Sequence, residues 1–539
     1  MRYKIFLLSA TLILLNSSII ATAFEYKRID TVPLKTLFAY DKNLPFNVEK
    51  KVLRETATTI TYSIYYDSSH EERVPAVLTV PKRKGPHPVI IFCHGYGMKK
   101  DLGPMADTII GQKGFAIFGI DTKYRNERER EGRDILSPYI YTSRDAFIQT
   151  VVDNMRGIDY LETLPEIDTS RIGIMGLSMG SYIGTILFSL DHRIQTATFG
   201  VGGADWTKVS EKSMFGPFYQ LRQSGRSVDE LLNAFATVDP INYVWDTKGR
   251  PVLMVNGRLD ELVPPEAAKA LFKGLAEPKH IIWFDGGHVP SIATIMNLVN
   301  EMLEWFKKYL NPEKYQIVAE KENVPPTISD LKILSTGEIR QNEKISLSVR
   351  ADDVNKNIIF VKAFFDCGDD EVLLYDDGKS GGDTVKGDGI YTGRHTMYEK
   401  AALGKSLIHV TAVDGWGAVS SELTAEIDVK PIQYPAGAHP PAITDVIAPE
   451  SAHIGDKIHF EIHAQDPDKD LDQILISIIE IGLTLSMPPD SSGAVIQDFS
   501  LPDMVPPGTY HIKAQAKDKT KMYSEAVEKT LEVLPSEKK

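Results

Sequence analysis

Hydrophobic residues in the first half of the chain gather in short unbroken runs instead of alternating with polar residues. The five runs are PVIIFC at 88–93, FAIFGI at 115–120, RIGIM at 171–175, PVLMV at 251–255 and IIWF at 281–284. A strand with such a sequence is apolar on both faces, so both faces need cover, as in a parallel sheet between helices. Ahead of these runs, TATTITYSIYYDS and RVPAVLTVP predict two antiparallel strands joined by a polar turn.

Between these runs, apolar residues recur at the spacing of a helix. One set is Phe147, Val151, Met155 and Ile158, and the other is Ile292, Ile295, Val299, Met302 and Phe306. Strands that alternate with helices in this way build an α/β layer architecture. We therefore predict one α/β domain over residues 24–312.

The pattern changes after a polar, proline-bearing linker at 313–324. From there on, only short strands occur between Gly, Asp and Pro clusters, and the sequence repeats itself. PPTISDLKI at 325 is echoed by PPAITDVIA at 440, and EKISLSVRADDVNKN is echoed by DKIHFEIHAQDPDKD. The offset of 115 residues, from 325 to 440, is the size of one β-sandwich. We expect two tandem immunoglobulin-like β-sandwiches, over 325–430 and 440–535, with a linker at 431–439.

Composition and charge narrow the class of protein without naming it. A chain of 539 residues is too long for one hydrophobic core, which agrees with several domains. With 42% hydrophobic and 25% charged residues, it has the composition of an ordinary globular protein. The formal net charge of -13 argues against a nucleic-acid partner, because nucleic-acid-binding proteins carry basic patches.

The first 23 residues have the build of a secretory signal peptide. They begin with basic residues, continue with an apolar stretch, and end in the small residues Ala21-Thr22-Ala23. An uncleaved membrane anchor is the alternative, but the polar break Asn16-Ser17-Ser18 favours the signal peptide. We predict cleavage near Ala23 and a secreted, periplasmic or cell-surface protein.

A sharp corner is predicted at Gly-Leu-Ser-Met-Gly, residues 176–180. An apolar run leads into it and a small-residue helical stretch follows at once. Two glycines let a strand and a helix approach closely while Ser178 is held in a strained turn. The amide of Met179, at the start of the helix, would be one donor to an oxyanion. The alternative is a plain glycine-rich turn whose serine caps the helix.

A second oxyanion donor is expected from the loop after an earlier central strand. His94-Gly95-Tyr96-Gly97 follows the run that ends at Cys93, and we predict that the Tyr96 backbone N–H is this donor. His94 reads as a structural histidine that fixes the loop rather than as a catalytic base.

An acid and a base are expected at the ends of later strands. Asp260, in NGRLDELVP, follows the run at 251–255, with Glu261 as a competing carboxylate. His288, in GGHVP, follows the run at 281–284, whereas His280 precedes that run and falls at the opposite end of the sheet. A serine hydroxyl becomes a nucleophile when an imidazole takes its proton and a carboxylate orients the imidazole. The order serine, acid, histidine is the one that this architecture uses.

The motifs HGYG, GLSMG, NGRLDELVP and GGHVP follow one another in this order along the chain. With them, residues 50 to 312 resemble bacterial α/β-hydrolases of the dienelactone hydrolase and acetyl xylan esterase type. The resemblance implies an α/β-hydrolase fold, a mostly parallel sheet flanked by helices, and hydrolysis of carboxylic esters without a cofactor or metal.

Carried over motif by motif, the resemblance implies that Ser178 is the nucleophile, His288 the base and Asp260 the orienting acid. It implies that Tyr96 and Met179 form the oxyanion hole. Dienelactone hydrolases proper use a cysteine nucleophile, so the serine here favours ordinary esters over lactones.

An insert at about 204–248 separates two of the predicted strands. It carries a helical stretch, SVDELLNAFA, and several aromatic residues. Insertions at this place of the fold commonly cap the active site, so we predict that Trp206, Phe215 and Phe218 bind substrate. A surface helical hairpin is the alternative.

The first repeat contains an acidic, glycine-rich loop at 376–389. Its four acids, Asp376, Asp377, Asp383 and Asp388, offer oxygen atoms of the kind that calcium binds. The spacing is not that of an EF-hand loop, and Asp-Gly pairs are ordinary turn formers. We favour turns and predict no metal site.

These features together predict a secreted serine esterase whose substrate is a small or polysaccharide-linked ester. The β-sandwiches would space the enzyme or hold it at a cell surface or on a polymer. One alternative is a serine peptidase of the prolyl oligopeptidase type, although too few residues precede residue 88 for the propeller of that group. The other is a surface adhesion protein with an inactive hydrolase domain.

Overall fold

The computed structural model describes residues 34–70, 72–111, 113–137, 139–212, 228–290, 292–310, 322–478, 480, 483–500 and 507–535. The predicted signal peptide and two of the predicted substrate-binding residues, Phe215 and Phe218, lie outside these ranges. No helix in the described part of the chain has the length and apolar character that crossing a membrane requires.

A nine-stranded sheet forms the centre of the first half of the chain. Its strands are β1 (Glu49–Glu55), β2 (Thr59–Asp67), β3 (Arg73–Pro81), β4 (His87–Cys93), β5 (Ala116–Ile120), β6 (Ile167–Leu177), β7 (Ile194–Gly200), β8 (Val252–Gly257) and β9 (Lys279–Phe284). Their order is β1-β2-β3-β5-β4-β6-β7-β8-β9. Pairing is antiparallel from β1 to β5 and parallel from β5 to β9. The carboxyl ends of the parallel strands therefore meet at one edge.

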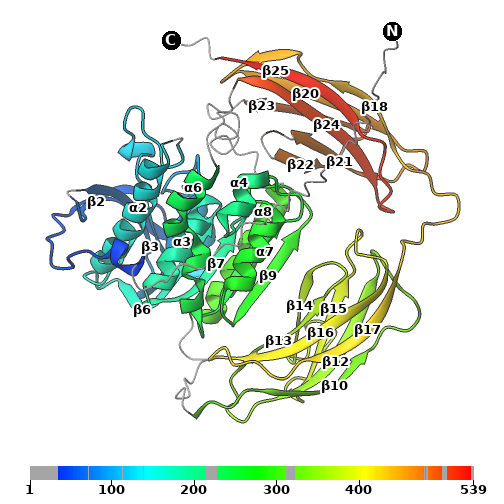
Figure 1. Ribbon diagram of the computed structural model, residues 1–539, viewed down its shortest axis with the longest axis horizontal. Coiled ribbons are helices and arrows are strands. Elements are labelled where there is room, and N and C mark those ends of the chain that lie inside the picture. Colours follow the sequence, from blue (N-terminus) through cyan, green and yellow to red (C-terminus); the bar gives the residue numbers. More distant parts are fainter. Residues whose placement is uncertain are drawn as a thin grey trace, which may run out of the picture.

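Helices cover both faces of this sheet (Figure 1). The helices are α2 (Ile140–Leu161), α3 (Met179–Leu190), α4 (Trp206–Lys212), α6 (Val228–Phe235), α7 (Pro265–Gly274) and α8 (Ile292–Tyr309). Val89 and Ile91 of β4 pack into the apolar cluster that contains the first five helices, whereas Ile90 and Phe92 pack into the cluster that contains α8. Because successive strand residues point to opposite faces, both faces of β4 are buried. The predicted α/β fold is confirmed.

Two strands were not anticipated from the hydrophobic pattern. Strand β1 lies at the edge of the sheet, and six of its seven residues are exposed, so its sequence is polar. Strand β7 follows a short connection after α3 and carries threonines at buried positions. The five apolar runs fall on β4, β5, β6, β8 and β9, although Phe115 and Pro251 lie one residue ahead of their strands. Both predicted helices lie within α2 and α8.

The second half of the chain forms two β-sandwiches. The first sandwich contains β10 (Thr327–Ile333), β11 (Ile339–Arg340), β12 (Lys344–Asp352), β13 (Ile358–Phe365), β14 (Asp370–Leu374), β15 (Ile390–Thr396), β16 (Gly404–Asp414) and β17 (Leu423–Lys430). The second sandwich contains β18 (Ala442–Ile447), β19 (Ser451–His453), β20 (Lys457–Gln465), β21 (Leu471–Ile478), β22 (Leu483–Met487), β23 (Ala494–Ser500), β24 (Gly508–Asp518) and β25 (Val527–Leu534). Every element named for the two repeats is a strand, which agrees with the prediction of two all-β sandwiches.

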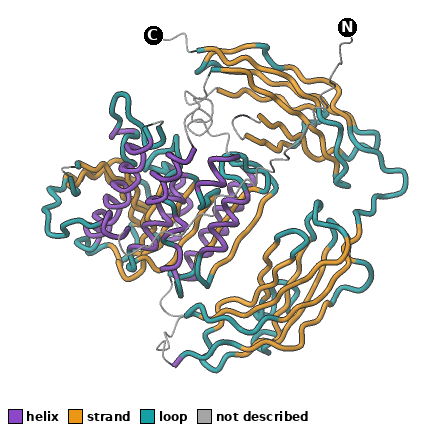
Figure 2. The backbone as a smooth tube through the Cα atoms, viewed as in Figure 1, coloured by secondary structure: helices purple, strands orange, loops and turns teal. Residues whose placement is uncertain are grey.

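The two sandwiches have the same topology, strand for strand. Each pairs a three-stranded sheet, β10-β12-β15 or β18-β20-β23, with a five-stranded sheet, β11-β17-β16-β13-β14 or β19-β25-β24-β21-β22. Each also contains one short parallel pair, β11 with β17 or β19 with β25. The sequence repeat is thus a structural repeat. The connection between the sandwiches runs as a loop on the side away from the helices (Figure 2).

The first sandwich shares an apolar core with the α/β domain. Phe360 of β13 and Val413 of β16 belong to the same buried cluster as α8, and the Phe360 ring stacks on Trp305 with 5.6 Å between centroids. The second sandwich has an apolar cluster of its own. It meets the first sandwich through Lys517, which lies 2.7 Å from a carboxylate oxygen of Glu399.

Candidate active site

Ser178 stands at a strained corner between β6 and α3. Its φ of 53° lies in the left-handed region that non-glycine residues rarely adopt, and its N–H donates to Gly200 O at 2.8 Å. The corner depends on the absence of side chains around it. A Cβ on Gly180 would lie 1.9 Å from Cys93 O, and one on Gly176 would lie 2.5 Å from Gly180 O. The glycine–serine–glycine pattern therefore follows from close backbone packing.

Ser178, His288 and Asp260 form a hydrogen-bonded row. Nε2 of His288 lies 2.8 Å from Ser178 Oγ, and Nδ1 of His288 lies 2.8 Å from Asp260 Oδ2. His288 is 9% exposed and Asp260 is 2% exposed, so the row is largely shielded from water. Because the Asp260 carboxylate can only accept a hydrogen bond, the imidazole proton lies on Nδ1. The lone pair of Nε2 is then free to accept a hydrogen bond from the serine hydroxyl. The structure brings these three predicted residues together.

The choice between the two adjacent carboxylates is clear from their contacts. Asp260 Oδ1 accepts hydrogen bonds from the Leu262 and Val263 amides at 2.9 and 2.8 Å, which fixes the carboxylate that contacts His288. Oε2 of Glu261 is buried without a donor among the described residues. Burial, Glu480 and Asp260 together raise the pKa of Glu261. Asp260, and not Glu261, contacts the imidazole.

The HGYG loop lies against the serine corner. A Cβ on Gly95 would come within 3.1 Å of Leu177 O and 3.4 Å of Ser178 Cβ, so the loop backbone can approach only because Gly95 has none. The Tyr96 hydroxyl donates to Asp134 Oδ2 at 2.8 Å, and Arg125 lies 4.3 Å from the centre of the Tyr96 ring. These contacts fix Tyr96 beside the corner. The donor roles of the Tyr96 and Met179 amides stay predictions.

His94 occupies a structural position in this loop. Its Nε2 accepts from the Thr122 N–H at 3.3 Å, which leaves the proton on Nδ1 for donation to Gly95 O at 2.9 Å. Burial lowers the pKa of His94, which favours the neutral ring that this pattern requires. His280, the other histidine that we set aside, contacts Glu371 of the first sandwich.

Trp206, in the insert, lies in the core. It is 3% exposed, stacks on Tyr182 of α3 at 4.5 Å, and meets the Phe235 ring edge-on at 5.2 Å. Its backbone N–H donates to Asp239, a buried carboxylate whose pKa burial raises to about 6. These contacts hold the insert to α3. They give Trp206 a structural role, and its contact with substrate stays a prediction.

Sequence reasoning missed a charged network behind the active site. Arg258, two residues before Asp260, donates to Gly368 O at 3.1 Å, pairs with Asp370 of the first sandwich, and lies 4.2 Å from the Tyr398 ring. It also lies 3.7 Å from Asp285, three residues before His288. The loops that carry the acid and the histidine are thus held by the first sandwich. Only the folded chain brings these groups together.

The acidic loop at 376–389 folds as a set of turns, as favoured. Asp376 accepts from the Gly387, Asp388 and Gly389 amides, and Asp377 accepts from two more amides. The carboxylate oxygens of Asp376 and Asp377 therefore accept hydrogen bonds from backbone N–H groups of the loop.

A serine at a strand–helix corner, with an acid and a histidine following on later strand ends of a mostly parallel sheet, defines the α/β-hydrolase class. Within that class, the family model "Acetyl xylan esterase (AXE1)" matches residues 39–309, which is 271 of the 539 residues. The chain belongs to this family and is a carboxylic ester hydrolase. The resemblance drawn from its motifs is confirmed.

The chain is also similar to three known proteins. The Bacillus subtilis (strain 168) protein YtaP is 21% identical over 290 residues, which are 48% of this chain and 93% of that protein. "Acetyl esterase Axe7A" of Xylanibacter ruminicola is 24% identical over 232 residues, 40% of this chain and 53% of that enzyme. The crystal structure of acetyl xylan esterase 1 from Thermoanaerobacterium sp. JW/SL YS485 has 20% identity and a TM-score of 0.43, covering 50% of this chain and 92% of that one.

Proposed function

We propose that the protein is an exported serine esterase that removes acyl groups, acetyl foremost, from carbohydrate. The observation that carries this proposal is the position of the His288 ring, which contacts Ser178 Oγ with one nitrogen and Asp260 with the other, both at 2.8 Å. An imidazole between a hydroxyl and a carboxylate is the arrangement of a nucleophilic serine with its base.

In the first step, Nε2 of His288 takes the Ser178 proton while Oγ attacks the ester carbonyl. The Asp260 carboxylate stabilises the imidazolium that forms and holds its orientation. The carbonyl oxygen becomes an oxyanion, which the Met179 and Tyr96 amides would receive as hydrogen-bond donors. The protonated His288 then donates to the leaving alcohol. In the second step, His288 takes a proton from a water molecule whose oxygen attacks the acyl carbonyl. His288 then gives that proton to Ser178 Oγ as the bond between Oγ and the acyl carbon breaks, which releases the acid.

Two facts support acetylated carbohydrate as the substrate. The family to which the chain belongs is described as acetyl xylan esterase, and one relative is named an acetyl esterase. A serine rather than a cysteine nucleophile also suits ordinary esters. The N-terminal residues 1–23 support export, which would bring the enzyme to extracellular polymers.

The nucleophile is tested with p-nitrophenyl acetate and acetylated xylan, using the wild type, Ser178→Ala and Ser170→Ala. Ser170 is exposed and serves as the matched control. We expect Ser178→Ala to lose roughly a millionfold in kcat, as when a triad nucleophile is removed, and Ser170→Ala to keep the wild-type rate. Equal rates for Ser178→Ala and the wild type would remove Ser178 from the mechanism.

The same assays separate the two alternatives. Aminoacyl p-nitroanilides cleaved faster than esters would favour a serine peptidase. A fluorophosphonate that fails to label Ser178 in the wild type would favour an inactive hydrolase domain in a surface protein. Acetate release from acetylated xylan, together with labelling of Ser178, supports the esterase.

A further inference from the structure

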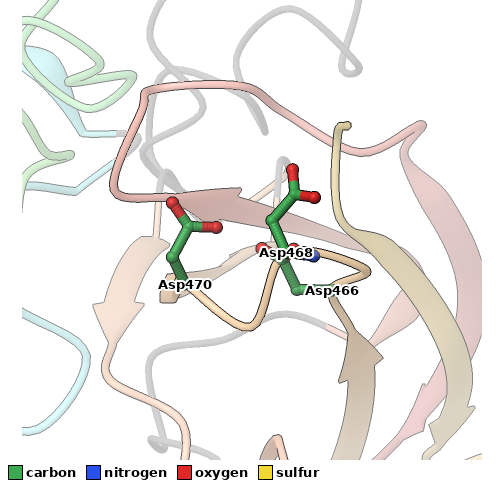
Figure 3. Close-up of side chains that lie close together, drawn as sticks. All are labelled: Asp466, Asp468 and Asp470. Carbon is green, nitrogen blue, oxygen red and sulfur yellow. The ribbon is translucent and has the colours of Figure 1, made fainter. Parts of the chain in front are cut away.

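The turn between β20 and β21 of the second sandwich gathers three carboxylates. Asp466, Asp468 and Asp470 alternate along the turn, and one oxygen from each lies within 4.8 Å of the others (Figure 3). Of the residues that the structure describes, this is the one group of three or more acids, histidines or cysteines with such spacing.

A fourth carboxylate lies beside this turn, at the end of β24. Asp518 is 1% exposed, and its Oδ1 accepts from the Met522 N–H and the Thr520 hydroxyl at 2.9 and 2.8 Å. Its Oδ2 is buried without a donor among the described residues. Asp518 pairs with Leu471 across β24 and β21, and the Lys519 N–H donates to Asp470 O at 3.0 Å, which places Asp518 beside the cluster.

Three buried carboxylate oxygens in this cluster have no hydrogen-bond donor among the residues that the structure describes. They are Asp466 Oδ2, Asp470 Oδ1 and Asp518 Oδ2. In the described part of the chain, no lysine or arginine pairs with any of these three acids. Buried polar atoms normally have a partner, and like charges this close repel, so the arrangement is unfavourable unless a cation lies among the oxygens.

The first sandwich provides an internal reference, because the strand register gives each acid a counterpart. Asp353, Asn355, Asn357 and Asp414 stand where the second sandwich has Asp466, Asp468, Asp470 and Asp518. The Val324 N–H donates to Asn355 Oδ1 at 2.7 Å, and the His439 N–H donates to Asp468 Oδ2 at 2.6 Å, so the approaching chain also matches. Two of the four acids are amides in the first sandwich.

A side-chain amide bridges two of these four residues in the first sandwich. Asn323 Nδ2 donates to Asp414 Oδ2 at 2.5 Å, and Asn323 Oδ1 accepts from Asn357 Nδ2 at 3.2 Å. The residue at the place of Asn323 in the second sandwich is Ala438, one position before His439. The second sandwich therefore lacks the amide donor and has twice the number of carboxylates.

We propose that the second sandwich binds a calcium ion between Asp466, Asp468, Asp470 and Asp518. Calcium takes several oxygen ligands in flexible geometry and accepts carboxylates in one- or two-oxygen contacts. Acids at alternate positions of a turn, with a fourth from a neighbouring strand, provide such a set. Magnesium suits it less, because magnesium requires near-octahedral geometry and keeps most of its water.

The ion would connect two segments that set the position of the second sandwich. Asp468 holds the His439 amide, at the end of the linker from the first sandwich. Asp518 precedes the turn that leads to Tyr523, whose hydroxyl donates to Glu399 of the first sandwich. Calcium would thus stiffen the linker and the contact together.

The test uses the full chain, freed of divalent ions with EDTA and then titrated with calcium chloride. Isothermal titration calorimetry should give one site with a Kd of roughly 0.1–1 mM, the range of extracellular calcium modules. Differential scanning calorimetry at 10 mM calcium should show the transition of the second sandwich raised by roughly 6–20 °C. The absence of heat and of a shift would overturn the proposal.

Two variants make the test specific. Ala438→Asn with Asp470→Asn rebuilds the amide network of the first sandwich, so this double variant should fold and lose the calcium response. Asp376→Asn, in the acidic loop of the first sandwich, should keep it. A double variant that folds, by circular dichroism, and still binds calcium with the wild-type Kd would overturn the proposal. A magnesium response equal to that of calcium would overturn the choice of ion.

Discussion

The two β-sandwiches have one topology and two kinds of attachment. At one matched position on the outer face of the five-stranded sheet, the first sandwich has the cross-strand pair Phe360 and Val413, and the second has Gln473 and Lys517. The apolar pair packs on α8 of the α/β domain, whereas Lys517 reaches a carboxylate of the first sandwich. The two sandwiches therefore share their strand arrangement. They differ in the residues on one outer face, and these residues determine what each sandwich contacts.

The two sandwiches also differ in the charged residues on this outer face. Lys362 of the first sandwich is buried between Glu277 of the α/β domain and its own Glu371, at 2.8 and 3.2 Å, and Glu371 also contacts His280. The matched position of Lys362 in the second sandwich is Leu475. The first sandwich is therefore joined to the α/β domain by an apolar patch and a buried ionic group, and we expect the two to unfold together.

The largest effect is expected from Phe360→Ala. It removes a ring that is 2% exposed and stacks on Trp305, so the free energy of unfolding of the joined unit should fall by about 3–5 kcal/mol. Chemical denaturation followed by tryptophan fluorescence measures this change. Gln473→Ala, at the matched position of the second sandwich, should change it by less than about 0.5 kcal/mol. Equal losses in the two variants would contradict the difference in attachment.

A smaller effect, of about 3 kcal/mol, is expected from Glu371→Gln, which leaves Lys362 with one carboxylate fewer in a buried site. Burial alone would raise the pKa of Glu371, but Lys362 and His280 outweigh it and hold that pKa below its usual value. A carboxyl with a lowered folded-state pKa adds stability above its unfolded pKa of about 4.3. This stability is lost as the pH falls through the lower, folded-state pKa.

Unfolding free energies from pH 6 down to pH 3 measure this dependence. We expect a steeper loss in the wild type than in Glu371→Gln. Glu426→Gln, in an exposed pair with Lys405, should keep the wild-type slope. A Glu371→Gln slope equal to that of the wild type would show that the buried group does not control acid stability.

The smallest effect is expected from Asp370→Asn, and it is an effect on rate. The change weakens the contact that holds Arg258, two residues before Asp260, while the Gly368 and Tyr398 contacts of Arg258 remain. We expect kcat/KM for p-nitrophenyl acetate to fall about three- to tenfold, on the order of 1 kcal/mol. Asp369→Asn breaks only an exposed pair with Lys269 and should leave kcat/KM unchanged. The same rate in Asp370→Asn and the wild type would exclude this support of the acid loop.

The candidate site could be predicted because its chemistry is local to each motif. Gly176 and Gly180 reveal a close backbone crossing, and Ser178 between them has no packing role that would explain two glycines. Asp260 and His288 each follow an apolar run that could only be a buried strand. Each strand therefore delivers its residue to one edge of the sheet, and the hydrogen-bonded row follows from the topology.

The contacts between domains could not be predicted, because they join residues far apart along the chain. One signal was nevertheless present. The run IIFVKAFF at 358–365 is apolar at neighbouring positions, whereas the matching stretch at 471–478 alternates more regularly. A strand without alternation in an antiparallel sandwich indicates that its outer face is covered too. For Trp206, the sequence shows only that an aromatic residue lies in the insert. Its stacking on Tyr182, which places it in the core, could not be predicted.

The support of the active site is unequal among its three residues. Arg258, two residues before the acid, contacts Asp370 of the first sandwich and also Asp285, three residues before the histidine. Ser178 is instead fixed by the crossing of β6, α3 and the HGYG loop. A small rotation of the sandwich would therefore carry the carboxylate and the ring as a pair and change the gap between the ring and the alcohol. Turnover would fall although the contact between the imidazole and the carboxylate stayed intact, so a domain outside the catalytic fold would control the rate of proton transfer.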